Sequence, residues 1–227
     1  MSSQPKINTA PQHLGGNMFE IAKSLKLPNI LVRELHPGHR EKIRLHLLAL
    51  SETDRSLRFG LHTSDEVINN YVAHIDFSND SVFGVFDKQL NLIACAHLAY
   101  PALKQVNNRT AEFGVSVSTE GRGMGIGSAL FKRAATHARN TNIEILYVHC
   151  LSRNKVMMHI AEKAGMEIEF SYGEADAYLK LPKPNNSSIV AEAVHAQAAD
   201  IDYAVKKNIQ QSKFLISQIR SLAISTK

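Results

Sequence analysis

Glycines alternate with other residues in the segment Arg122-Gly-Met-Gly-Ile-Gly127, between an apolar run that ends at Val117 and an apolar stretch that continues past Phe131. Because glycine carries no Cβ, the backbone of such a loop can turn tightly and come close to a ligand. The first N–H groups of a following helix lack intrahelical partners and lie at the positive end of its dipole, so they suit an anion. This spacing therefore predicts a site that holds a phosphorylated cofactor with backbone amides.

Two other phosphate-binding loops have a different spacing. A Walker A loop requires Gly, four residues, Gly, Lys and then Ser or Thr, and the sequence contains no such run. A dinucleotide-binding loop requires Gly-x-Gly-x-x-Gly, which the alternating glycines from Gly121 to Gly127 do not form. The simplest alternative is a glycine-rich turn that joins a strand to a helix without binding a ligand.

The sequence after the loop contains a second pattern. An apolar, β-branched run, Ile143–His149, predicts a strand. Apolar residues then recur at helical spacing from Val156 to Ala164, and Gly165 stands where a helix often ends with a glycine. The predicted order is therefore strand, glycine loop, helix, strand, helix.

Both patterns resemble signatures of the GCN5-related N-acetyltransferase (GNAT) superfamily, and the resemblance covers residues 30–182. The acetyl-CoA pyrophosphate loop of that superfamily reads Gln/Arg-x-x-Gly-x-Gly/Ala, and Arg122, Gly125 and Gly127 match its positions. The second signature is matched at Asn154, Met157, Ile160, Lys163 and Gly165, with Met166 in place of the usual Phe. The resemblance predicts an α/β fold: a mixed, mostly antiparallel sheet of about seven strands with helices on both faces.

The resemblance also implies where acetyl-CoA, the expected co-substrate, would bind. The strand before the loop would splay from the next strand and pair its backbone with the pantetheine arm, with Gly114 as the position of a β-bulge. The loop amides would then hold the pyrophosphate. The residues implied in cofactor binding are Val115, Ser116, Val117, Arg122, Gly123, Met124, Gly125, Ile126, Gly127, Ser128 and Asn154.

Transfer of an acetyl group to an amine requires a base, because a lysine amine has a pKa of about 10.4 and only its neutral form is nucleophilic. Glu112 lies on the predicted strand before Gly114 and resembles the glutamate general base of many GNAT enzymes. Partial burial would raise the pKa of its carboxyl group toward the working range. The alternative for Glu112 is a solvent-facing strand residue. His149, at the end of the next predicted strand, is the second candidate base.

One position departs from the family pattern. Many GNAT enzymes carry a Tyr seven residues after the signature asparagine, where it protonates the leaving thiolate, but this chain has Ala161 there. Tyr172, Ser152 or water could take that role. The thiolate could also leave unassisted, since a thiol has a pKa of about 8.5.

Three features resemble the acetyltransferase domain of bacterial protein-lysine acetyltransferases. They are the absence of that Tyr, the presence of Met157 and the sequence of the segment Leu50–Phe59. In that segment, Arg55, Arg58 and Phe59 lie where the family binds acceptors, or they anchor the loop. The expected activity is transfer of an acetyl group to a primary amine, on a protein lysine or on a small molecule. The rival function is a non-catalytic acyl-CoA sensor whose C-terminal helix binds a partner.

The resemblance implies a bacterial enzyme, and composition and charge agree with a cytoplasmic protein. The N-terminus has no secretory signal, and no apolar run reaches the ~18 residues that a membrane span requires. Cys95 and Cys150 are expected to be reduced and buried, and no Cys/His spacing predicts a metal site. Acids balance bases in residues 30–182, and the net charge of +5 comes from the two ends. A basic, nucleic-acid-binding face on the domain is therefore not expected.

The chain divides into three expected regions: an N-terminal extension, partly disordered, over residues 1–29, an acetyltransferase domain over 30–182 and a C-terminal helical extension over 183–227. The extension at the N-terminus could contain a short helix over residues 17–26. In the domain we expect a first strand at residues 30–35, two helices connected by Leu50–Phe59, and a hairpin of residues 81–86 and 92–99.

The C-terminal extension contains no glycine and no proline after residue 184 and carries a narrow apolar stripe at helical spacing. Such a helix is not stable alone in water and must pack on something. It could fold back on its own domain, or it could form a homodimer or bind another partner.

Overall fold

The computed structural model describes residues 29–60, 62–100 and 109–225. Seven strands form one sheet in the order β1-β2-β3-β4-β5-β7-β6. The strands are β1 (Arg33–Leu35), β2 (Ser81–Phe86), β3 (Leu92–Ala99), β4 (Thr110–Val117), β5 (Ile145–Leu151), β6 (Glu167–Ser171) and β7 (Glu174–Lys180). Neighbouring strands are antiparallel, except that β4 and β5 are parallel. The helix predicted over residues 17–26 lies outside the described residues.

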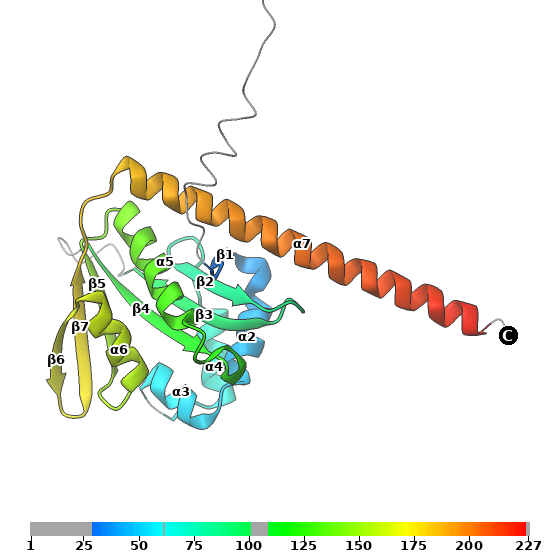
Figure 1. Cartoon of the computed structure of the whole chain (residues 1–227). Helices are drawn as coiled ribbons and strands as arrows, with labels where there is room; N and C mark the ends of the chain where they lie inside the picture. Colours follow the sequence, from blue (N-terminus) through cyan, green and yellow to red (C-terminus); the bar gives the residue numbers. More distant parts are fainter. Residues whose placement is uncertain (1–28, 61, 101–108, 226–227) are drawn as a thin grey trace, which may run out of the picture.

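Helices cover both faces of the sheet (Figure 1). They are η1 (Pro37–His39), α2 (Arg40–Leu48), α3 (Glu52–Phe59), α4 (Asp65–Ala73), η2 (Thr119–Gly121), α5 (Ile126–Asn140), α6 (Lys155–Ala164) and α7 (Asn186–Ser225). On one face, α5 and α6 pack against β4 and β5 around Phe113, Leu130 and Leu146. On the other face, α2 and α4 pack around Ile43 and Ile68. The predicted mixed α/β fold with its C-terminal helix is confirmed.

The segment between α2 and α4 differs from the prediction, because residues 52–59 form a helix instead of a plain connection. At its start the Ser51 hydroxyl accepts a hydrogen bond from the Asp54 backbone N–H. At its end Gly60 has a φ of 80°, the left-handed conformation of a helix C-cap. Only Leu57 and Phe59 of its eight residues are apolar, so the two caps were the clearest signal for this helix.

The first strand is also shorter than predicted, since β1 begins only at Arg33. The backbone N–H of Val32 donates to Nε2 of His195 on α7 at 3.0 Å, and not to a neighbouring strand. The hairpin prediction, by contrast, is confirmed at both strands, residues 81–86 and 92–99.

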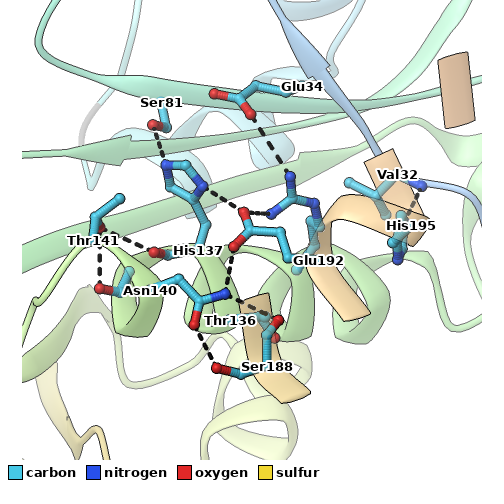
Figure 2. A network of polar contacts seen from close by, with 12 residues as sticks. Val32, Glu34, Ser81, Thr136, His137, Asn140, Thr141, Ser188, Glu192 and His195 are labelled. Carbon is cyan, nitrogen blue, oxygen red and sulfur yellow. Dashed lines mark hydrogen bonds and ion pairs between the residues drawn. The ribbon is translucent and has the colours of Figure 1, made fainter. Parts of the chain in front are cut away.

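A buried polar cluster fixes the first half of α7 to the domain (Figure 2). The Glu192 carboxylate accepts hydrogen bonds of 2.6 Å from Arg133 and from Asn140, and it lies 2.7 Å from Nδ1 of His137. Burial alone would raise the pKa of Glu192, but the partners His137, Asn140 and Arg133 lower it to about 2. The carboxylate also compensates the charge of Arg133, whose side chain is only 3% exposed. This half of α7 folds back on its own domain.

The second half of α7 extends away from the sheet (Figure 1). Gln210 still donates a hydrogen bond to the Lys88 carbonyl at 3.1 Å. Further along, Phe214 and Leu215 are 62% and 61% exposed. Within the described ranges, no helix has both the length and the apolar character that a membrane span requires.

Candidate active site

Strands β4 and β5 separate in the middle of the sheet. Their parallel pairing covers three register positions, and the last of these joins Glu112 to Tyr147. Beyond it, β4 stays paired with β3 as far as Val117, while β5 stays paired with β7 as far as Leu151. The two strands therefore diverge, and in the described structure the backbone of residues 113–117 has no strand partner on the β5 side.

A cavity of about 210 Å³ lies in this gap, and we call it the β4–β5 cleft. Both strands, α3, α6 and the glycine loop contribute to its walls. Of the residues singled out from the sequence, Arg58, Val115, Ser116, Val117, Arg122, Gly127, His149 and Asn154 line it. Asn154 also caps α6, since its side-chain oxygen accepts a hydrogen bond from the Met157 backbone N–H at 3.1 Å.

The glycine loop meets the cleft at the start of α5. Gly123 and Gly125 have φ angles of 73° and 77°, left-handed conformations that favour glycine. The Gly125 carbonyl accepts the first intrahelical bond of α5, from the Ala129 N–H. The amides of Ile126, Gly127 and Ser128 precede that bond, so helix geometry leaves them available to an anion.

A second cavity, of about 510 Å³, lies between α5 and α6. Ser128 and the basic side chains of Lys132, Arg139 and Lys163 line it. Ile160 lines both this cavity and the cleft, so the two spaces are neighbours. A Cβ on Gly127 would lie 3.1 Å from Cδ1 of Ile160, so the Ile160 side chain would have to shift slightly to admit one.

Arg122 connects the glycine loop to α3. Its Nη2 lies 2.5 Å from Oδ2 of Asp54 in the first turn of that helix. Burial alone would raise the pKa of Asp54, but hydrogen bonds from Ser51 and Arg122 lower it. Both charged side chains line the cleft, so the ion pair forms part of its wall.

Gly114 does not form the predicted β-bulge. The register of β3 and β4 is continuous from Glu112 to Val117, with Gly114 opposite His97. The glycine instead makes room for Arg58, because a Cβ at this position would lie 2.5 Å from the guanidinium carbon. The gap in the sheet arises from the divergence of β4 and β5, so a bulge is not needed to open it.

Arg58 belongs to a polar network that sequence reasoning missed. Its Nη2 donates to the Tyr71 hydroxyl at 3.0 Å, and that hydroxyl lies 2.6 Å from Nδ1 of His97. Nε2 of His97 is 3.1 Å from Oδ2 of Asp80. Burial lowers the pKa of His97, although Asp80 opposes this shift. The network holds Arg58 against the backbone of Gly114, at the wall of the cleft.

Glu112 lies at the last paired position of β4, opposite Tyr147 of β5. Its side chain is exposed, so the partial burial expected for this residue is wrong. On this face of β4, Arg58 covers Gly114, but Glu112, two residues earlier, lies beyond that cover. The charge of Glu112 still acts on nearby groups, and it is among the smaller causes that raise the pKa of His149 and of Tyr147.

His149 lies within β5, with Leu151 as the last residue of the strand. Its Nδ1 is 2.8 Å from Oδ1 of Asp176 on β7, and the Tyr147 hydroxyl donates to the same oxygen at 2.5 Å. The hydrogen bond with Asp176 raises the pKa of His149 above its ordinary value. Sequence reasoning found the histidine but not its carboxylate partner, which comes from a strand that is distant in sequence.

The side chain of Ser116 is buried on the face of the sheet that α2 covers. Its hydroxyl lies 2.8 Å from Nε2 of His46 on α2, and Nδ1 of His46 lies 3.0 Å from the Leu92 carbonyl. His46 is 5% exposed, and burial lowers its pKa to about 4. The neutral imidazole therefore fixes the floor of the cleft at neutral pH.

Acid should destabilise the protein through His46. The pKa of His46 in the folded state lies below its ordinary value. The stability that neutral His46 contributes is therefore fully present above about pH 6.5 and is lost as the pH falls toward 4. At pH 5 the expected loss from this residue is about 2 kcal/mol. Urea unfolding at pH 7.5 and 5.0 measures it, and His46→Gln should show a shallower pH dependence than wild type. The exposed His62→Gln variant is the control; equal slopes in both variants would contradict the assignment.

Several other predicted residues lie elsewhere. Arg55 donates to the carbonyls of Leu48, Leu50 and Thr63 and pairs with Asp65 at 2.7 Å, so it holds the α3–α4 connection together. Phe59 packs against Tyr71 with ring centroids 5.3 Å apart. The Ser152 hydroxyl donates to the Gly173 carbonyl, and Tyr172 is fully exposed. Met124 is 62% exposed on the loop, and the side chain of Ile126 is buried in the core.

The family model for the acetyltransferase (GNAT) family matches residues 47–166, which is more than half of the chain. The matched range contains the glycine loop, Asn154 and both walls of the cleft. The chain belongs to this family. The predicted superfamily and the predicted enzyme class, an N-acetyltransferase, are thereby confirmed. No curated protein sequence matches the chain significantly.

Solved structures of GNAT proteins share the fold. The GNAT domain of PAT from Streptomyces lividans is 21% identical, with a TM-score of 0.56 over 66% of this chain and 89% of that one. Spermidine N-acetyltransferase from Vibrio cholerae, in complex with CoA and spermine, is 24% identical, with a TM-score of 0.50 over 66% and 94%. A GNAT acetyltransferase from Streptococcus pneumoniae is 16% identical, with a TM-score of 0.53 over 67% and 100%.

Proposed function

We propose that this GNAT protein transfers the acetyl group of acetyl-CoA directly to a primary amine. The observation that carries the proposal is the β4–β5 cleft. The glycine loop forms part of its wall, and Glu112 and Tyr147, the last paired residues of the two strands, precede residues that line it. The unpaired backbone of Val115–Val117 suits an extended, amide-containing chain such as pantetheine, which can pair with it like an added strand.

Two further features support acetyl-CoA as the co-substrate. The amides of residues 126–128 suit the pyrophosphate, and Arg122, which is paired with Asp54, lies beside them as a further N–H donor. The cavity between α5 and α6, with Lys132, Arg139 and Lys163, suits the phosphorylated nucleotide end. When bound, acetyl-CoA supplies the acetyl group as an activated thioester.

Glu112 is the residue we assign as base. Its carboxylate is exposed beside the cleft, where it can attract a cationic amine and accept a proton from it, directly or through one water. Glu174 and Asp176 on β7 add negative charge near His149, which favours a cationic acceptor. His149 is the second candidate, and its raised pKa means that it would act as base only at higher pH.

Thiol release from acetyl-CoA tests the proposal. The panel contains polyamines, amino acids and lysine peptides, and each peptide has a control in which norleucine replaces lysine. We expect release that depends on at least one primary amine and is absent with its control. Calorimetry measures acetyl-CoA binding alongside. Binding without any amine-dependent release would support the sensor function, and absence of binding would overturn the proposal.

A further inference from the structure

Arg58 carries a positive charge that no carboxylate of the described structure compensates. Three residues that line the β4–β5 cleft can be cationic, and the other two are paired. Arg122 pairs with Asp54 at 2.5 Å. His149 lies 2.8 Å from Asp176. The guanidinium of Arg58 is therefore the group in the cleft wall that is available to an anion.

A chain of hydrogen bonds holds this guanidinium in place. Asp80 can only accept, so Nε2 of neutral His97 donates to it at 3.1 Å, and Nδ1 accepts from the Tyr71 hydroxyl at 2.6 Å. The Tyr71 oxygen in turn accepts the 3.0 Å hydrogen bond from Nη2 of Arg58. Among the described residues this hydroxyl is the only hydrogen-bond acceptor of the guanidinium. Its remaining N–H groups can therefore donate to a ligand.

The guanidinium also lies where the acyl end of acetyl-CoA is expected. A Cβ on Gly114 would lie 2.5 Å from Cζ of Arg58, so the group rests on the backbone of β4 just after its pairing with β5 ends. A pantetheine arm that leaves the glycine loop and pairs with residues 115–117 brings its thioester toward Gly114. Glu112 is two residues further along β4, about 7 Å away, and its side chain points to the same face.

Charge around the cleft argues against a role of Arg58 in attracting the acceptor. The carboxylates of Glu112, Glu174 and Asp176 favour a cationic amine, which a guanidinium would repel. Arg58 suits instead a group that becomes negative during the reaction. The carbonyl oxygen of the thioester is such a group, and acyl transfer requires hydrogen-bond donors for it. The register of β4 is continuous at Gly114, so no bulge re-aims a backbone N–H there, and a side chain can supply the donor.

We propose that Arg58 is a catalytic residue that donates hydrogen bonds to the carbonyl oxygen of the acetyl group, an inference that rests on the proposed acetyl transfer. The amine nitrogen forms a bond to the acetyl carbon, and an electron pair of the C=O bond moves to the oxygen beside the guanidinium. When that pair returns, the C–S bond breaks and CoA leaves as a thiolate. Of the two protons that the ammonium group loses, one goes to Glu112 and one reaches the thiolate through water.

Binding of S-carboxymethyl-CoA tests the charge of Arg58 without turnover. This thioether places a carboxylate where the acetyl carbonyl of acetyl-CoA would lie. In calorimetry, wild type should bind it about 10- to 100-fold more tightly than CoA, the value of a hydrogen bond to a charged group. Arg58→Gln should lose this preference and keep the affinity for CoA within about twofold, which also shows that the site is intact.

Arg109→Gln is the matched control, because Arg109 is exposed just before β4 and is not among the residues that line the cleft. This variant should keep the preference of wild type. An unchanged preference in Arg58→Gln would overturn the role of Arg58 and leave the proposed function standing. A wild type that binds neither CoA nor its carboxymethyl derivative would overturn both.

Steady-state kinetics distinguishes Arg58 as a donor to the carbonyl from Arg58 as a binder of the acceptor. With an accepted amine, Arg58→Gln should lower kcat by about 100- to 1,000-fold, the usual effect of losing such a donor. The KM for the amine should stay within about twofold. A raised KM at unchanged kcat would assign Arg58 to the acceptor and overturn the inference.

Discussion

Replacing Glu112 with glutamine should lower kcat at neutral pH by about 100- to 10,000-fold, the usual contribution of a general base. The change keeps the shape of the side chain but removes its ability to accept a proton. Acetyl-CoA contacts are not expected to involve this side chain, so the dissociation constant measured by calorimetry should stay within about twofold. Steady-state kinetics with the best acceptor from the panel gives kcat.

The matched control is Glu169→Gln on β6, which removes an exposed carboxylate at a register position opposite Asp176. It should leave kcat nearly unchanged. Equal activity of Glu112→Gln and wild type would remove Glu112 from the mechanism and assign the base to His149. In that case activity should rise with pH through the raised pKa of His149, and His149→Asn should abolish the rise.

Replacing Gly125 with valine should weaken acetyl-CoA binding by about 100-fold, the value of one or two lost hydrogen bonds to a charged group. Gly125 has a φ of 77°, which costs a residue with a Cβ about 1–2 kcal/mol, so the loop would rearrange. The amides that follow it would then no longer converge on one anion. Calorimetric titration with acetyl-CoA measures the effect.

Gly173→Val is the control that distinguishes loss of the binding loop from general backbone strain. Gly173 has a φ of 91° in the β6–β7 turn, and a Cβ there would meet nothing within 4 Å. This variant should lose comparable stability in urea unfolding but bind acetyl-CoA like wild type. If Gly125→Val binds with unchanged affinity, the assignment of the loop is wrong.

Local patterns made most of the fold predictable. The strand before the loop, the glycine loop and the two helices on one face of the sheet follow from residue spacing within short segments, and α6 ends at Gly165 as predicted. The length of α7 follows from the absence of glycine and proline after residue 184. Helix α3 was missed because it is short and mostly polar, with only Leu57 and Phe59 as apolar residues, so its caps were the clearest signal.

The parts of the site that sequence reasoning missed are contacts between distant segments. Nothing near Gly114 in the sequence indicates that Arg58, on another element, takes the place of a side chain there. Likewise Tyr71, His97 and Asp80 come from separate elements, and only the packed fold brings them together. The exposure of Glu112 depends on where the cover of the sheet ends, which no local pattern specifies.

The divergence of β4 and β5 also divides the sheet into two parts that share one hydrophobic core. Strands β1 to β4 are neighbours in sequence order, and β5, β7 and β6 all come from residues 145–180, so each half of the sheet closes mostly over short chain separations. Only the three register positions from Thr110 to Glu112 connect the halves within the sheet. The cleft thus lies where the two parts of the sheet are held together least, and amide protection against hydrogen exchange should change most there between the free and liganded protein.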